Sequence, residues 1–282
     1  MSAVYSGGMR VPRLAACVPS AMPEYMQSLT VLQRVLDFQE ALAEKLEPRL
    51  GFRLEEALAK WREGRPLFAE ATFHYPPSLL TEALQGLEKL LQAETPAREA
   101  CRALLQSHWL QADAVPDLMG RLLQEREAFL EQLADELRVD AKVLGSVLRT
   151  VLSPYFVREA APYQEWITEA RWRRGFCPIC GCWPGMARLA QEDGRRVLAC
   201  CLCHSEWAFD RLRCPFCEQE GKPEMRYFTV EGDEVHRIEC CEHCKAYIKT
   251  VDERKLGHPA HLIVEDMITA HLDALAQEQG YH

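Results

Sequence analysis

Apolar residues recur three or four positions apart through most of residues 24–170, which is the spacing of one buried face of an α-helix. Prolines and polar clusters divide this stretch into six or seven predicted helices. Residues 1–23 lack the pattern and carry Gly7-Gly8 and several prolines, so we expect them to be irregular. The pattern therefore predicts an irregular N-terminal segment followed by an α-helical bundle.

Prolines mark the boundaries of several predicted helices. Ser78 is the predicted N-cap of a leucine-rich helix, with an acidic residue in its first turn. Thr95-Pro96 predicts the start of another helix, because a first-turn proline lacks only an N–H that has no partner there. A later apolar helix is predicted to end at Ser153-Pro154, because proline breaks the helical hydrogen-bond ladder.

The pattern changes after Arg171 from helical spacing to short runs of β-prone residues. Such runs lie at 196–198, 226–230 and 235–238, and the intervening 231–233 has the composition of a hairpin turn. These runs predict two small antiparallel sheets. Beyond Pro259 apolar residues return to helical spacing, which predicts one terminal helix.

Four Cys-x-x-Cys motifs lie within the same part of the chain. Two cysteines with two residues between them place both sulfurs on one side of a turn, and two such turns supply the four thiolates of a tetrahedral metal site. Nineteen residues separate the first two motifs and 23 the last two, enough for a hairpin in each case, whereas ten residues link the pairs. We therefore predict two metal sites, with Cys177, Cys180, Cys200 and Cys203 as ligands of the first and Cys214, Cys217, Cys241 and Cys244 as ligands of the second.

The predicted fold class is α+β. The segments are an irregular N-terminus, an α-helical domain, two small rubredoxin-like or zinc-ribbon-like β modules and a C-terminal helix. Four thiolates suit both iron and zinc, so the motifs leave the metal open. The predicted boundaries are 1–23, 24–170, 171–210, 211–258 and 259–282.

Three further cysteines, Cys182, Cys201 and Cys240, lie beside the motifs. They are either small packed residues or thiols that react beside a metal. His204 and His243 also adjoin the motifs, but each motif already supplies two cysteines, so we do not expect histidine ligands.

Composition narrows the classes of function. The net charge is −9, and residues 166–260 carry 15 Lys/Arg and 15 Asp/Glu, which argues against nonspecific binding of nucleic acid. A zinc-ribbon nucleic-acid-binding protein remains the alternative, with Arg171, Arg173, Arg174, Arg195 and Arg196 as its basic patch. A thiol–disulfide enzyme is disfavoured, because ligated thiolates are not free nucleophiles. No catalytic residues are predicted, and we do not expect an enzyme.

The sequence also predicts where in the cell the protein is located. The first 30 residues lack a continuous apolar core of signal-peptide length, and no stretch approaches the roughly 20 apolar residues of a membrane span. We therefore expect a cytoplasmic protein without membrane insertion. Cytoplasmic thiols stay reduced, which favours metal ligation over disulfides.

The cysteine motifs in their context resemble the formate dehydrogenase accessory protein family (formation protein E). The resemblance rests on Cys177-Pro-Ile-Cys-Gly181, Cys200-Cys-Leu-Cys-His-Ser-Glu-Trp207, Arg211-Leu-Arg-Cys-Pro-Phe-Cys217 and Glu239-Cys-Cys-Glu-His-Cys244. The segment from Leu262 to Tyr281 resembles the family's C-terminal helix.

The resemblance implies a cytoplasmic accessory protein that binds the molybdenum-containing catalytic subunit of respiratory formate dehydrogenase before or during its twin-Arg-directed export. It implies two rubredoxin-like metal domains after a helical domain, with iron the favoured metal and zinc possible. The eight motif cysteines would be the ligands. The resemblance leaves the oligomeric state open, and Cys182, Cys201 and Cys240 depart from the family's pattern.

Overall fold

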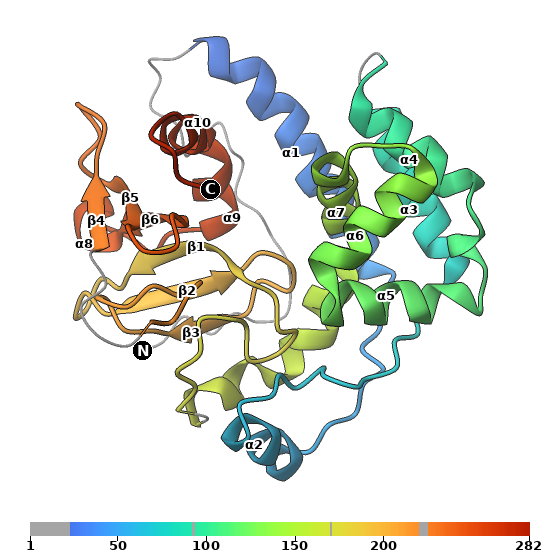
Figure 1. Ribbon diagram of the computed structural model, residues 1–282, viewed down its shortest axis with the longest axis horizontal. Coiled ribbons are helices and arrows are strands. Elements are labelled where there is room, and N and C mark those ends of the chain that lie inside the picture. The colour runs from blue at the N-terminus through green and yellow to red at the C-terminus, as the bar shows by residue number, and fades with distance from the viewer. Residues whose placement is uncertain (1–22, 92–93, 170, 220–224) are drawn as a thin grey trace. The chain divides into compact units, whose positions relative to one another are not determined.

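The computed structural model describes residues 23–91, 94–169, 171–219 and 225–282. Within them, the contacts divide the chain into two compact units, 23–53 with 68–162 and 54–67 with 163–282. The first unit is helical and the second is built around a sheet, so the predicted α+β class is confirmed (Figure 1). The five segment boundaries read from the sequence stay a prediction.

The described part of residues 24–170 contains seven α-helices, within the predicted six or seven. The second helix belongs to the sheet-containing unit, and the other six form the helical unit. Their bounds are α1 Pro23–Glu44, α2 Leu54–Arg62, α3 Pro77–Leu90, α4 Pro96–Gln106, α5 Ala114–Gln124, α6 Arg126–Leu137 and α7 Ala141–Ala160, with short 3-10 segments η2 His108–Leu110 and η3 Ala161–Glu169.

Helix α7 runs straight through the proline that was expected to end it. Pro154 has no N–H to donate to the carbonyl of Thr150, four residues earlier. The side chain of Gln39 on α1 donates to that carbonyl instead, with Nε2 2.8 Å from the oxygen. The predicted end at Ser153-Pro154 is therefore wrong, because a neighbouring helix supplies the missing donor.

The two other proline boundaries differ in outcome. Helix α4 begins as predicted, with the Thr95 hydroxyl accepting from the N–H of Arg98 at 3.3 Å. Helix α3 already begins at Pro77, and Pro76 precedes it without a side-chain cap, so the predicted N-cap at Ser78 is wrong. A proline at the first helical position fits there because its fixed φ suits the helix.

In the part of the chain that the structure describes, six strands form a single sheet in the order β3-β2-β1-β6-β5-β4. Neighbours are antiparallel except for the central pair, in which β1 runs parallel to β6. The expectation of two separate antiparallel sheets is therefore wrong. Each three-stranded half has an open edge, and pairing β1 with β6 satisfies the backbone groups of both edges. The strands are β1 Pro184–Leu189, β2 Arg196–Cys200, β3 Glu206–Ala208, β4 Met225–Phe228, β5 His236–Cys241 and β6 Tyr247–Asp252.

Helices at the C-terminus pack against this sheet (Figure 1). They are α8 Glu253–Leu256, α9 Leu262–Ile268 and α10 Ala270–Glu278. Leu262 packs with Met186 and Val251 of the central strands, and Leu272 packs with Ile238 of β5. The single terminal helix expected from the sequence is broken at Thr269, whose hydroxyl donates to the carbonyl of Glu265 at 2.6 Å.

Candidate metal centres

Strand direction places both cysteine-rich sites at the same end of the sheet. In each half a Cys-x-x-Cys turn precedes the first strand, and the second strand leads into the other turn, so Pro184 pairs with Cys200 and Met225 with Cys241. Strand β1 is parallel to β6, and β6, β5 and β4 alternate in direction, so β1 and β4 run the same way. The turns that precede β1 and β4 therefore lie at the same end of the sheet. The four turns are knuckle 1 (177–180), knuckle 2 (200–203), knuckle 3 (214–217) and knuckle 4 (241–244).

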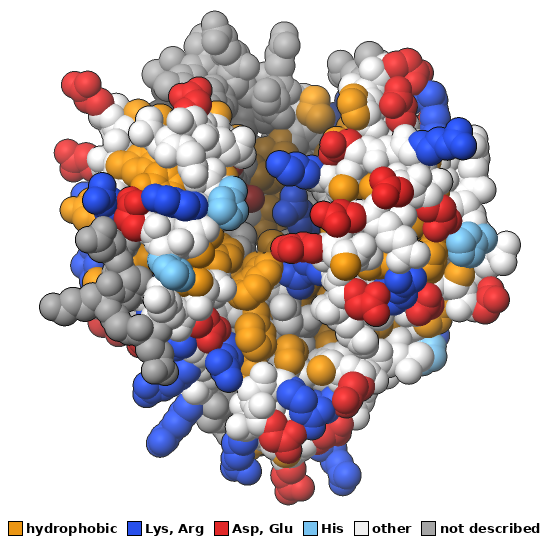
Figure 2. Space-filling view, viewed as in Figure 1, with side chains coloured by type: hydrophobic (Ala, Val, Ile, Leu, Met, Phe, Trp, Pro, Cys, Tyr) orange, Lys and Arg blue, Asp and Glu red, His pale blue; other side chains and the backbone are white. Residues whose placement is uncertain are grey.

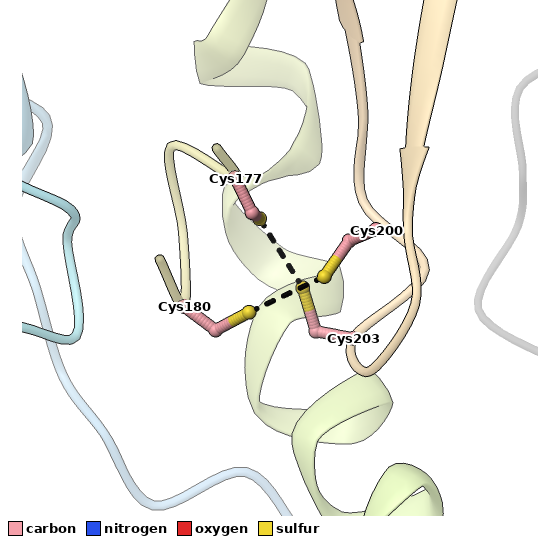
Figure 3. A group of neighbouring side chains, drawn as sticks. All are labelled: Cys177, Cys180, Cys200 and Cys203. Atoms are coloured by element: carbon pink, nitrogen blue, oxygen red, sulfur yellow. Dashed lines mark hydrogen bonds between the residues drawn. The ribbon is translucent and has the colours of Figure 1, made fainter. Parts of the chain in front are cut away.

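The first centre is formed by Cys177, Cys180, Cys200 and Cys203, whose sulfurs all lie within 4.8 Å of one another. The side chains of knuckle 1 point toward those of knuckle 2 (Figure 3). The Sγ atoms of Cys177 and Cys203 are 3.5 Å apart, and those of Cys180 and Cys200 are 3.4 Å apart. All four cysteines are buried.

The second centre repeats this arrangement with Cys214, Cys217, Cys241 and Cys244. The Sγ atoms of Cys214 and Cys244 are 3.7 Å apart, and those of Cys217 and Cys241 are 3.8 Å apart. Cys217 and Cys244 are only partly buried, so this centre is nearer to solvent than the first. The two groups contain the eight cysteines that the sequence singled out, and their role as ligands stays a prediction.

Both sets of distances fit a metal ion. Metal–sulfur bonds of about 2.3 Å directed to the corners of a tetrahedron put the sulfurs about 3.8 Å apart. The first centre adjoins the pair β2 and β1, and the second adjoins the pair β5 and β4. These pairs are three strands apart, so the two centres are separated by about 14 Å at about 4.8 Å per strand. Ions in a shared two-metal site lie about 4 Å apart, so these would be two separate mononuclear sites.

Backbone and thiol hydrogen bonds act on the sulfurs of the first centre. The N–H of Ile179 points to Cys177 Sγ, and the N–H of Leu202 to Cys200 Sγ, each at 3.4 Å. Such N–H···S contacts stabilise thiolates and tune a bound metal. The same contact recurs in the second centre, where backbone N–H groups of knuckle 4 help to hold the pKa of Cys241 below its ordinary value against the effect of burial.

The thiol pKa values show what a cation would add. Burial raises the pKa of Cys177 and of Cys180 well above the ordinary value. Burial also acts to raise the pKa of Cys200, but hydrogen bonds from the thiols of Cys177 and Cys180 outweigh it and hold that pKa well below the ordinary value. The protein alone therefore does not keep all four sulfurs ionised, whereas a divalent cation would offset their charge.

Helix α2 and the loop after it hold knuckle 1, which the sequence did not indicate. The carbonyl of Pro178, inside knuckle 1, accepts from the indole Nε1 of Trp61 at 2.7 Å and from the N–H of Leu67 at 2.8 Å. Trp61 is buried. The contact joins residues more than a hundred positions apart, which no local pattern can reveal.

Two features join the halves of the sheet. Gly175 lies so close to knuckle 3 that an added Cβ would be 1.7 Å from the carbonyl oxygen of Pro215, so only glycine fits there. The guanidinium of Arg196 on β2 is fully buried, and its Nη2 lies 3.0 Å from Oε2 of Glu239 on β5. Its Nη1 donates to the carbonyl of Arg213 at 3.0 Å. The two halves are therefore tied by side chains as well as by the β1–β6 pairing.

The remaining cysteines divide into packed residues and one pair. Cys240 packs with Ile238 and Leu272, and burial raises its pKa to about 12. Cys101 is likewise buried within α4, and burial raises its pKa to about 11. Cys182 and Cys201 instead lie together beside the first centre, and Cys17 lies outside the described residues.

The proposed basic patch is incomplete. Arg196 is buried in its ion pair, so it cannot face a nucleic acid, while Arg171, Arg173, Arg174 and Arg195 are exposed. Over the helical unit, acidic and basic side chains are interspersed on the face shown in Figure 2. No observation on the described residues therefore favours the nucleic-acid alternative.

The fold and the two centres define a class: a protein with a helical unit and a continuous sheet that holds two tetra-cysteine sites in tandem. Residues 212–282 match the model of the family described as "FdhE, C-terminal domain". Residues 212–282 are therefore similar to the C-terminal domain of the FdhE family, in agreement with the resemblance in the cysteine motifs. None of the described helices is long and apolar enough to cross a lipid bilayer.

Curated relatives match over somewhat more than a third of this chain. The Protein FdhE homolog of Pectobacterium atrosepticum is 33% identical over 111 residues, which are 38% of this chain and 35% of the relative. The homolog of Aquifex aeolicus is 33% identical over 114 residues, 39% of this chain and 40% of the relative. Protein FdhE of Escherichia coli K12 is 31% identical over 112 residues, 39% of this chain and 35% of the relative. The matched region thus spans well under half the length of these relatives.

The fold similarity extends over nearly the whole chain. The crystal structure of the FdhE protein from Pseudomonas aeruginosa superposes with a TM-score of 0.61 and covers 95% of this chain and 88% of that chain. The sequence identity of that superposition is 21%, so it establishes the common fold of the helical and sheet-containing units.

Proposed function

We propose that this protein is a cytoplasmic accessory protein for the maturation of a respiratory formate dehydrogenase. In this role it binds the catalytic subunit and supports its assembly or activation. The observation that carries the proposal is the pair of four-cysteine centres on one sheet, the second of which lies within residues 212–282 that match the FdhE C-terminal domain. The named relatives support the same assignment.

The geometry of the centres favours a binding role over turnover. Each centre provides four thiolates for one ion, which fills a tetrahedral shell and leaves no open position for a substrate. We propose that Cys177, Cys180, Cys200 and Cys203 hold one iron ion, and that Cys214, Cys217, Cys241 and Cys244 hold a second. Iron in such a site would supply one-electron chemistry, and zinc would supply only stability to the fold.

The accessory role is tested by formate dehydrogenase activity in a strain that lacks this gene. Wild-type protein and a Cys240→Ala control should restore the activity, because Cys240 is a packed residue outside both centres. A Cys177→Ala/Cys180→Ala variant should not restore it. Unchanged activity in the deletion strain, with normal amounts of the enzyme and no second copy of the gene, would refute the proposal.

Partner binding and metal identity need separate measurements. The purified chain should capture the catalytic subunit, and the knuckle 1 variant should capture less of it if the first centre shapes the docking surface. Protein purified without oxygen should contain two iron ions per chain and show sulfur-to-iron charge-transfer absorption on oxidation. Two zinc ions and no iron would exclude the redox role while leaving the accessory role intact.

A further inference from the structure

An arginine-rich surface lies where two segments of the sheet-containing unit meet, residues 171–174 before knuckle 1 and residues 210–213 before knuckle 3. The guanidinium Nη1 of Arg213 donates to the carbonyl of Arg173 at 3.0 Å. Arg174 and Arg213 also share the carboxylate of Glu218, at 3.2 and 3.3 Å. These contacts hold the two segments side by side. We call their exposed side chains the arginine surface, which consists of Arg171, Arg173, Arg174, Arg211 and Leu212.

The two segments carry an excess of positive charge. They contain five arginines and a single acid, Asp210, and two of the arginines share the neighbouring Glu218. The other three, Arg171, Arg173 and Arg211, are exposed and form no ion pair within the described residues. Because the whole chain has a net charge of −9, this positive excess is a local feature. It is complementary to an acidic partner.

Leu212 stands among these charges with its apolar side chain turned to solvent. It is 81% exposed, which is the largest exposed fraction of any large apolar side chain in the described part of the chain. The neighbouring aromatic side chains of Trp172 and Phe209 are buried and anchor the two segments. The indole Nε1 of Trp172 donates to the carbonyl of Phe176 at 2.8 Å, and the N–H of Phe209 donates to the carbonyl of Arg196 at 3.0 Å. A partner would thus meet a backbone that is already held in place, which reduces the entropy cost of binding.

We propose that the arginine surface docks an acidic segment of a partner protein, with an apolar side chain of that segment packed on Leu212. Guanidinium groups pair with carboxylates through two parallel hydrogen bonds. Burying Leu212 gives the same contact an apolar centre inside a charged rim, as in other protein–protein interfaces. That this partner is the formate dehydrogenase catalytic subunit rests on the proposed function, whereas the acidic and apolar character of the segment follows from the surface itself.

The same surface suits a nucleic acid less well. A duplex carries one phosphate for about every 1.7 Å of its length, so strong binding needs a long basic track. The side-chain charges of residues 166–260 sum to zero, and only three arginines of the surface lack an acidic partner among the described residues. The exposed Leu212 adds nothing to a contact with phosphate. Charge and apolar character together therefore favour a protein segment.

The test measures binding of two probes to the full metal-loaded chain. One probe is the purified catalytic subunit, and the other is a fluorescein-labelled synthetic peptide of alternating Glu and Leu. The variants are Arg173→Glu, Arg211→Glu and Leu212→Ser, all at exposed side chains, and the matched control is Lys255→Glu, which reverses an exposed charge on α8. Every variant should contain two metal ions per chain, which shows that it folds.

The two arginine variants should each weaken binding of both probes by about tenfold, because an attraction is replaced by a repulsion. Added salt should weaken binding by wild-type protein and reduce its difference from these variants, since salt screens exposed charges. Leu212→Ser should weaken binding by about fivefold without changing the dependence on salt, because it removes apolar contact area. Lys255→Glu should bind both probes as wild type does.

The results distinguish the docking surface from the proposed function. Equal capture of the catalytic subunit by wild-type protein and by all the variants would overturn the docking surface and leave the proposed function intact. Peptide binding that the arginine variants weaken, without capture of the catalytic subunit, would support the surface and refute the proposed function. Peptide binding that is absent or insensitive to salt, or duplex DNA bound more tightly than the peptide, would overturn the docking surface.

Discussion

The buried ion pair between Arg196 and Glu239 allows a sharp test of how the halves of the sheet are joined. Its two ends are not equivalent. Oε1 of Glu239 accepts from the Nε of Arg237 at 2.9 Å, and Oε2 faces Nη2 of Arg196 as an ion pair without a hydrogen bond. No second carboxylate among the described residues pairs with Arg196. Removing the Glu239 carboxylate therefore leaves the buried charge of Arg196 without a counter-charge. Removing the Arg196 guanidinium leaves Glu239 paired with Arg237.

The magnitude follows from the geometry. At 3.0 Å and an effective dielectric constant of about 20, two unit charges attract by about 5.5 kcal/mol. Breaking a buried pair from one side costs about 3–5 kcal/mol in measured cases. Because Arg196 keeps its hydrogen bond to the carbonyl of Arg213, we expect Glu239→Gln to lower the free energy of unfolding by about 3 kcal/mol. Arg196→Met should cost about 1 kcal/mol, since Glu239 retains Arg237.

The assay is urea unfolding of the metal-loaded protein followed by tryptophan fluorescence. This signal reports on the sheet-containing unit, because five of the six tryptophans belong to it. The double variant should resemble Arg196→Met, which gives a coupling energy of about 3 kcal/mol. Additive effects, or a larger loss for Arg196→Met than for Glu239→Gln, would refute the reasoning.

Three further outcomes are expected. Gln39→Leu should destabilise the helical unit by about 1–3 kcal/mol in thermal unfolding, because it leaves the Thr150 carbonyl unpaired. Adding Pro154→Ala should recover most of this loss, since alanine restores an N–H donor to that carbonyl. No recovery would show that Gln39 acts through packing. Burial acts to lower the pKa of His236, but its hydrogen bond to Glu265 and the charge of Asp233 raise that pKa above the ordinary value. Protonated His236 therefore stabilises the fold fully below about pH 6.5, and this stabilisation is lost as the pH rises through the folded-state pKa. The stability advantage of wild type over His236→Gln should therefore be larger at pH 6 than at pH 9, and an advantage independent of pH would contradict this assignment. A competing chelator should remove the ion of the second centre before that of the first, because Cys217 and Cys244 are partly exposed, and release of both ions at one rate would contradict the difference in burial.

The sequence by itself was sufficient for the local features of the sites. A Cys-x-x-Cys turn positions its two sulfurs through the backbone of four residues, so the motif and its spacing identify the sulfurs of both centres before any fold is known. Helical periodicity likewise predicted the helical unit, and the hairpin between β4 and β5 follows from the turn composition at 231–233. These features depend on interactions between residues close together in the chain.

Two of the errors share one cause, which is a partner distant in sequence. Pro154 does not end its helix because Gln39 supplies a donor from another helix. The two cysteine modules form one sheet because the edge strands β1 and β6 pair, although some 60 residues separate them. The support of knuckle 1 by Trp61 has the same character.

The chain sequence thus determined which sulfurs gather at each centre, because a tight turn of four residues is fixed by its own backbone. Only the tertiary structure decided that both centres lie at one end of one sheet, and that the first is buried while the second is partly exposed. Those properties arise from strand pairing and burial, and each depends on the free energy of contacts between segments far apart in the chain.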